Sequence, residues 1–346
     1  MAEREVKERP WSAWAHCFHK RSLLNDCMRI IFMGTPEFAV PSLEALLRSE
    51  HAVVGAVTQP DRPKGRGQDL VPSPVKLVCQ REGIALLQPS KMKNPAFIEA
   101  LRAWQPELIA VAAFGRILPP AILELPPRGC VNVHASLLPK YRGAAPIQWA
   151  LINGEKETGV TTMLMDVGMD TGAMLLQEQV SIDPEDTAGS LSEKLADVGG
   201  RLLIETLHRL KAGTITPQPQ DHSRATLAPL LRKQDGLIDW TLPATDLANR
   251  VRGLLPWPGA YCYAGHERWT ICRAAATAHH AGAGYPPGAI VQVNKEAFHV
   301  NTGNGILVVT ALKPAGGRQM SIREYLAGHA IRPGLVLGRN PDEKPT

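Results

Sequence analysis

One stretch of the sequence decides the fold class: Asn132-Val-His134-Ala-Ser136-Leu-Leu-Pro139-Lys-Tyr-Arg-Gly143-Ala-Ala-Pro146. It follows Gly129-Cys-Val, a run typical of a buried strand near its carboxyl end. Asn132 and His134 stand two residues apart, so an extended backbone directs both side chains to one face. Because open α/β sheets bind ligands at the carboxyl ends of their strands, the stretch predicts a small-ligand site at that edge.

A second candidate segment lies downstream, a glycine-punctuated turn that reads Met165-Asp166-Val-Gly168-Met-Asp170-Thr-Gly172. Asp170 is its best candidate for chemistry. Taken singly, His134 is more often a core or loop histidine, Asn132 a turn-stabilising side chain and Asp170 an Asx-turn residue. Taken together, the three favour a catalytic site.

These residues carry a family resemblance. The pattern Asn132-x-His134-x-Ser136-Leu-Leu-Pro139, with Asp170 placed 38 residues after Asn132, resembles the folate-dependent formyltransferases. Two further motifs, Gly34-Thr-Pro-Glu-Phe-Ala and Gln59-Pro-Asp-Arg-Pro, narrow the resemblance to members that act on methionyl-tRNA. The match runs from about Met28 to about Gly338, and Ala135 departs from it at a position where we expect glycine and where related enzymes vary.

The resemblance implies transfer of a formyl group from 10-formyltetrahydrofolate to the amino group of initiator methionyl-tRNA. The transition state of such a reaction resembles a tetrahedral oxyanion, so the site needs donors aimed at that oxygen and a route for a proton. Asn132 and His134 would be the donors, and Asp170 would orient the imidazole and take or relay the proton. The implied folate pocket comprises Phe114, Gly115, Ile117, Ser136, Leu137, Leu138, Pro139, Asp166 and Gly168.

Residues 58–74 are rich in proline and glycine, which predicts a mobile surface loop. Three cations, Arg62, Lys64 and Arg66, lie near its tip. Composition alone favours a solvated loop, whereas the resemblance implies a basic loop that grips the acceptor end of the tRNA.

A length of 346 residues favours two domains. Strand and helix patterns alternate from Arg29 onward, which predicts a mostly parallel, Rossmann-like sheet. From Gly236 the pattern changes to short β-like runs typical of a small barrel, and the family's second domain is OB-like. We therefore expect a disordered extension (1–27), a formyltransferase domain (28–213), a linker (214–234), an OB-like domain (235–338) and a tail (339–346).

Composition limits the partners. The net charge is +5, and residues 214–346 carry all of the excess, with 14 Lys and Arg against 9 Asp and Glu. A basic second domain favours a polyanionic partner without requiring one. The Gly34 turn lacks the three-glycine fingerprint, so we expect no dinucleotide cofactor.

The six cysteines form no Cys-x-x-Cys pair, and no apolar run of about 18 residues is present. Histidines such as His51 and His222 have no carboxylate or cysteine at metal-ligand spacing along the sequence. We therefore expect no disulfide framework, membrane span or metal, and predict a monomer in the cytoplasm.

Two other classes of function remain open from the residues. The first is a formyltransferase of the same fold acting on a nucleotide-linked amino sugar, or a 10-formyltetrahydrofolate hydrolase in which water replaces the amine. The loop bearing Arg62 and Arg66 favours tRNA, and residues 1–27 are too short for the regulatory domain that the hydrolases would be expected to carry. The second is a non-enzymatic RNA-binding protein, against which an intact Asn132, His134 and Asp170 set argues.

Overall fold

The structure is a computed structural model that describes residues 27–64, 69–277, 284–339 and 342. The expected N-terminal extension therefore lies outside the described residues except for Cys27, as does most of the expected tail. Within the described ranges, no helix is both long enough and apolar enough to cross a membrane.

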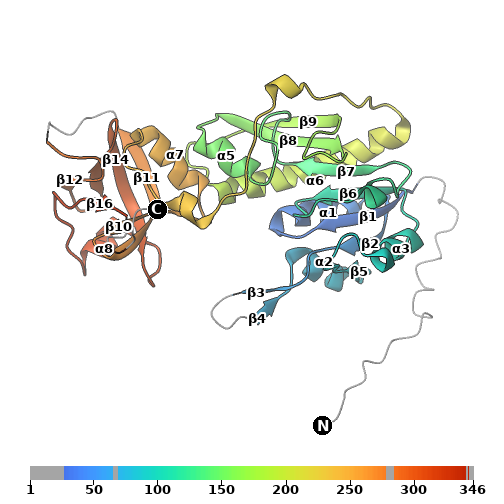
Figure 1. Ribbon diagram of the computed structural model, residues 1–346, viewed down its shortest axis with the longest axis horizontal. Coiled ribbons are helices and arrows are strands. Elements are labelled where there is room, and N and C mark those ends of the chain that lie inside the picture. Colours follow the sequence, from blue (N-terminus) through green and yellow to red (C-terminus); the bar gives the residue numbers. More distant parts are fainter. Residues whose placement is uncertain (1–26, 65–68, 278–283, 340–341, 343–346) are drawn as a thin grey trace, which may run out of the picture.

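A seven-stranded sheet forms the first domain, in the spatial order β5-β2-β1-β6-β7-β8-β9 (Figure 1). The first five strands in this order run parallel, and β8 and β9 are antiparallel additions at one edge. The predicted Rossmann-like, mostly parallel architecture is confirmed. The strand bounds are β1 Arg29–Gly34, β2 Ala52–Val57, β5 Leu86–Leu87, β6 Leu108–Ala112, β7 Cys130–His134, β8 Glu157–Leu164 and β9 Met174–Ser181.

Helices cover both faces of this sheet, which explains why its central strands are continuously apolar. Ile30 and Phe32 of β1 pack into a core with helices on one face, while Ile31 and Met33 pack into a second core on the other. The first face carries α1 (Val40–Arg48), α2 (Pro74–Glu82), α5 (Pro146–Ile152) and α6 (Ala188–Ala212), and the second carries α3 (Pro95–Ala103) and α4 (Pro120–Leu123).

The long helix α6 has defined ends. Thr187 accepts the backbone N–H of Ser190, whose hydroxyl accepts the N–H of Thr187, so the two residues form a capping box. Gly213 follows the last turn with a φ of 65°, a left-handed conformation that glycine adopts without strain, and so ends the helix.

A curled antiparallel sheet forms the second domain, in the order β12-β13-β14-β11-β10-β16, with β15 paired to β14. Backbone bonds from Leu337 N–H to Gly288 O and from Ile290 N–H to Leu335 O connect its first and last strands, which confirms the predicted OB-like barrel. The bounds are β10 Ala260–Ala264, β11 Glu267–Thr277, β12 Ile290–Val293, β13 Phe298–Asn301, β14 Ile306–Pro314, β15 Met320–Ser321 and β16 Leu337–Gly338, with helices α7 Ala244–Gly253 and α8 Ile322–Leu326.

The segment expected to be a mobile loop is partly a β-hairpin, which corrects the expectation. Strand β3 (Arg62–Lys64) pairs antiparallel with β4 (Asp69–Val71), and the hairpin projects from the sheet domain (Figure 1). Pairing between three-residue strands depends on cross-strand contacts, which proline and glycine content does not reveal. Arg66 lies outside the described residues.

Candidate active site

Strand β7 carries Asn132 and His134, and at this strand the pairing of the sheet changes from parallel to antiparallel. Its neighbour β6 runs parallel to it and its neighbour β8 antiparallel. His134 is buried and Asn132 half-buried. No described residue forms a hydrogen bond with the Asn132 side-chain amide, so that amide is available to a ligand.

The two ring nitrogens of His134 have different surroundings. Nε2 lies 2.9 Å from the carbonyl oxygen of Tyr141, and because a carbonyl can only accept, Nε2 carries a proton and donates it. Nδ1 lies 3.7 Å from Oδ2 of Asp170, too far for a direct hydrogen bond but close enough for electrostatic attraction once the ring is charged. In the neutral ring, Nδ1 is therefore the nitrogen that can accept a proton.

Asp170 is held in place from two sides. Its Oδ2 accepts the backbone N–H of Gly143 at 2.9 Å, and its carbonyl oxygen accepts the side-chain amide of Gln220 at 2.8 Å. The residue has a φ of 52°, a left-handed conformation that aspartate tolerates better than most residues. Gly143 has a φ of 120°, and a Cβ there would lie 2.7 Å from the carbonyl oxygen of Ala228, so the loop requires glycine.

The residues expected to form the folate pocket occupy different environments. Ser136 is buried and donates its hydroxyl to Lys140 O at 2.6 Å, so this side chain is used within the loop. Leu138 is buried and precedes a cis bond to Pro139. Phe114 is buried in a core and its carbonyl accepts the amide of Gln59 at 2.8 Å. Leu137 is half-buried and Gly115 is exposed.

Two of the expected pocket segments are open to solvent. Ile117 is 80% exposed, so a ligand could reach its apolar side chain. Asp166 accepts the N–H of Gly168 at 3.0 Å and the hydroxyl of Thr171 at 2.7 Å, which stabilises the turn leading to Asp170. This turn exposes Val167 and Met169, which also present apolar side chains to solvent.

Arg142 and Gln220 were not predicted as site residues. The buried Arg142 guanidinium donates to Gln220 Oε1 from Nε at 3.0 Å and from Nη2 at 2.7 Å, and its Nη1 lies 3.1 Å from His222 Nδ1. Backbone bonds from Arg142 N–H to Thr226 O and from Ala228 N–H to Arg142 O attach the same loop to residues 218–228. The expected linker is thus packed against the loop that holds Asp170. The composition of the linker gave no signal for this contact.

Two of the three residues expected to bind tRNA, Arg62 and Lys64, lie on strand β3 of the hairpin, whereas His134 lies on β7. Arg62 is exposed and donates to Gln59 Oε1 at 2.6 Å. Since Gln59 also donates to the Phe114 carbonyl, the base of the hairpin is connected to the loop after β6.

Two family models match the chain. Formyl transferase matches residues 28–207, and Formyl transferase, C-terminal domain, matches residues 230–330. Together they span both domains of the structure.

Solved structures with similar folds include an N-formyltransferase from Helicobacter canadensis in complex with folinic acid and dTDP-3-aminofucose. It has a TM-score of 0.59 and 20% identity, over 85% of this chain and all of that one (100%). Methionyl-tRNA formyltransferase from Clostridium thermocellum has a TM-score of 0.51 and 19% identity, over 72% of this chain and 93% of that one. At these identities the likeness concerns the fold.

Sequence relatives are much more similar. Methionyl-tRNA formyltransferase from Trichlorobacter lovleyi is 52% identical over 89% of this chain and 96% of its own length. The protein of the same name from Citrifermentans bemidjiense is 48% identical over 90% of this chain and 97% of its own length. With both domain models matched as well, this chain belongs to the methionyl-tRNA formyltransferase family.

Proposed function

We propose that this protein transfers the formyl group of 10-formyltetrahydrofolate to the free amino group of initiator methionyl-tRNA. The observation that carries the proposal is the His134–Asp170 pair at the strand end that also carries the Asn132 amide, which no described residue binds, in a chain of this family. The pair can move a proton, and the amide can donate a hydrogen bond to a developing oxyanion.

In the proposed reaction, the methionyl nitrogen attacks the formyl carbon and the carbonyl electron pair moves onto oxygen. The Asn132 amide donates to that oxygen. The amine's surplus proton passes to Nδ1 of His134, because Nε2 already donates to Tyr141 O. We thus propose His134 as the group that carries the proton, in place of the second oxyanion donor expected from the sequence. The carboxylate of Asp170 stabilises the resulting imidazolium. Collapse of the intermediate breaks the bond from carbon to the folate nitrogen, which receives a proton from the imidazolium.

The folate would occupy the space beside β7, where its pterin and linker need apolar surface and a few polar groups. Exposed Ile117 and the turn containing Asp166 and Gly168 support this placement. The remaining residues that we assign to the folate pocket are Phe114, Gly115, Ser136, Leu137, Leu138 and Pro139, of which the buried ones act by shaping the loop or through the backbone. No metal ion is part of the proposed reaction.

The tRNA would contact the β3–β4 hairpin through Arg62, Lys64 and Arg66. Projection of the hairpin from the sheet domain supports this role (Figure 1). Its connection through Gln59 to the loop after β6 would couple tRNA contact to the folate side of the site. We further propose that the protein acts as a monomer in the cytoplasm, where charged tRNA is made and used.

The function is tested by incubating the protein with 10-formyltetrahydrofolate and either methionyl-tRNA, dTDP-3-aminofucose or no acceptor. The formylated acceptor and the released formate are measured in each reaction. We expect incorporation into methionyl-tRNA alone. Formylation of the amino sugar in preference to tRNA would replace the proposed acceptor, and release of formate without an acceptor would indicate a hydrolase. The similar fold of the amino-sugar enzyme makes that acceptor the appropriate comparison.

A further inference from the structure

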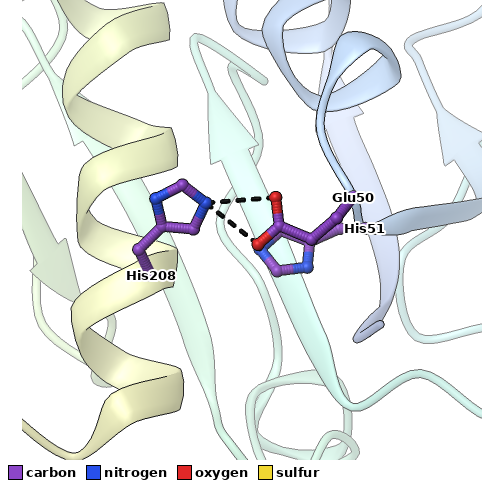
Figure 2. Close-up of side chains that lie close together, drawn as sticks. All are labelled: Glu50, His51 and His208. Atoms are coloured by element: carbon purple, nitrogen blue, oxygen red, sulfur yellow. Dashed lines mark hydrogen bonds and ion pairs between the residues drawn. The ribbon is translucent and has the colours of Figure 1, made fainter. Parts of the chain in front are cut away.

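A second cluster of ionisable side chains lies at the amino ends of the parallel strands, opposite the end that carries the proposed active site. Glu50 and His51 directly precede β2, so they lie at the amino ends of the parallel strands, whereas His134 lies at a carboxyl end. His208 reaches the same place from the carboxyl-terminal part of α6 (Figure 2). None of the three takes part in the proposed formyl transfer.

The geometry of this cluster is close. His208 Nε2 lies 2.9 Å from Glu50 Oε1 and 3.1 Å from Oε2, and His51 Nε2 lies 3.9 Å from Glu50 Oε1 (Figure 2). One possible ligand atom from each residue lies within 4.8 Å of the other two. Tetrahedral zinc, with bonds of about 2.0–2.2 Å to nitrogen and oxygen, places neighbouring ligand atoms about 3.3–3.6 Å apart. Small rotations of the side chains would reach that spacing.

His51 provides an independent observation. Its side chain is fully buried, at 0% exposure, yet no described residue forms a hydrogen bond with either ring nitrogen. Buried polar atoms without partners are rare in folded proteins and call for an explanation such as an ion. Because neither ring nitrogen has a partner among the described residues, a lone pair of the ring could bind a metal ion without breaking a hydrogen bond.

We propose that Glu50, His51 and His208 together bind one divalent transition-metal ion such as zinc, with a fourth position open to water. Two imidazoles and one carboxylate suit zinc, cobalt or nickel better than magnesium or calcium. The ion would crosslink the turn before β2 to α6 and so stabilise the packing of that helix on the sheet. The proposal departs from the expectation of no metal, because His208 is distant from the other two residues in sequence.

The charges around His51 are compatible with a cation. Besides Glu50 and His208, the ionisable groups that influence it are Lys211 and Glu107, of opposite sign, so their effects oppose one another. A hydrogen bond from its own backbone, followed by one from the His208 side chain, lowers the pKa of Glu50.

The test is a calorimetric titration of the chelator-treated, full-length protein with Zn²⁺ and, separately, Co²⁺. We expect one ion per chain for the wild type, with binding at least about tenfold weaker in His208→Ala and in Glu50→Gln. Both altered side chains are about half exposed, at 46% and 47%, so these variants should fold. The matched control is His266→Ala, since His266 is an exposed histidine paired with Asp342 at 3.1 Å.

A second measurement is the melting temperature with and without Zn²⁺. Zinc should raise it in the wild type and in His266→Ala, excess chelator should reverse the rise, and His208→Ala should show none of it. Failure of the wild type to bind one ion, or equal binding by all variants, would overturn the site and leave Glu50 and His208 as an ordinary ion pair. Because formylation is measured separately with the same variants, this result does not depend on the proposed function.

Discussion

At the scale of single residues, the proton chemistry of the site depends on which ring nitrogen of His134 carries the proton. The Tyr141 carbonyl fixes the Nε2 proton, which leaves Nδ1 facing Asp170. A histidine fixed in this way serves as a proton acceptor first and as a donor once charged. Asn132, with no partner among the described residues, is then the permanent donor for the oxyanion.

The first prediction concerns these two residues. Asn132→Ala should lower kcat by about 10²–10³, the usual loss for one oxyanion donor. His134→Ala should lower it by about 10²–10⁴, the usual loss for a general acid–base group, and both should change KM little. Asn132→Asp should be at least as slow as Asn132→Ala, because it keeps the shape but replaces the N–H donor by an acceptor. Steady-state kinetics and melting temperatures of the three variants provide the check, and a His134→Ala enzyme within a few-fold of wild type would refute the assignment.

The second prediction concerns Arg142, a positioning residue that holds residues 218–228 against the loop bearing Gly143. Arg142→Met should lower the free energy of unfolding by about 1.5–3 kcal/mol, because it removes hydrogen bonds from a charged donor to Gln220. It should also lower kcat, because Gly143 and Gln220 both hold Asp170.

Arg142→Lys separates charge from geometry, since lysine keeps the charge but loses the fork that contacts Gln220 with two nitrogens. It should resemble Arg142→Met in kcat. The exposed Arg224, on the neighbouring 3-10 turn, supplies the control Arg224→Met, which should stay near wild type in urea unfolding and in kinetics. Equal behaviour of the Arg142 and Arg224 variants would show that the contact between Arg142 and Gln220 does not position Asp170.

At the scale of elements, the β3–β4 hairpin and the segment that follows α6 both form backbone pairs where the sequence predicts a loop or a linker. The hairpin exposes Leu70 and Val71 beside its basic residues, at 69% and 41%, so it presents apolar as well as charged groups. The segment 214–234 adds bridges at Gln218 and Leu227 to the first domain. Its bonds to Arg142 make it part of the scaffold of the site.

The third prediction is that neutralising the hairpin weakens tRNA binding specifically. A variant with Arg62, Lys64 and Arg66 changed to glutamine should raise the Kd for methionyl-tRNA. It should also reduce the log–log salt slope by about 0.7–0.9 for each phosphate that the variant no longer neutralises. Folate binding should be unchanged, since the folate is proposed to bind beside β7.

The matched control is a triple variant with the same change in charge at exposed arginines on three helices of the sheet domain: Arg48, Arg81 and Arg102. Fluorescence titration of labelled tRNA at several salt concentrations distinguishes the two variants. If the helical variant showed as large a fall in affinity and salt dependence as the hairpin variant, the hairpin would have no special role.

At the scale of the whole molecule, the two domains share a hydrophobic contact. Ile152 of α5 lies in one core with Leu247 and Val251 of α7, and the second domain lies at one end of the molecule (Figure 1). Arg252 adds polar contacts, donating to Asp186 O at 3.1 Å and to Asp183 O at 3.4 Å. This interface sets the orientation of the OB-like domain relative to the sheet.

The fourth prediction is that Arg252 stabilises this orientation. Arg252→Met should lower the free energy of unfolding by about 1.5–3 kcal/mol, because it leaves carbonyls at a half-buried interface without their donor. It should also raise KM for tRNA while sparing folate binding. Arg273→Met is the control, since it removes an exposed ion pair to Glu185 worth at most about 1 kcal/mol. Similar losses in both variants, measured by urea unfolding, would contradict a specific role for Arg252.

Much of the architecture was predictable from the sequence by itself, because hydrophobic periodicity and glycine positions are local signals. The alternation of strands and helices from Arg29 and the short strands after Gly236 both appear in the structure as expected. The spacing of Asn132 and His134 likewise placed both on one strand, at the expected edge of the sheet.

Contacts between distant residues were decided only by the tertiary structure. Gln220 donates a hydrogen bond to Asp170 from a segment that has the composition of a linker. Strands β3 and β4 of the hairpin pair with each other. His208 meets Glu50 across 158 residues of sequence. Such contacts depend on where the packing of the two cores places each segment of backbone. Local propensity and motif spacing do not predict that placement. The motif thus determined which residues are available for chemistry, and the packed chain determined which neighbours hold them.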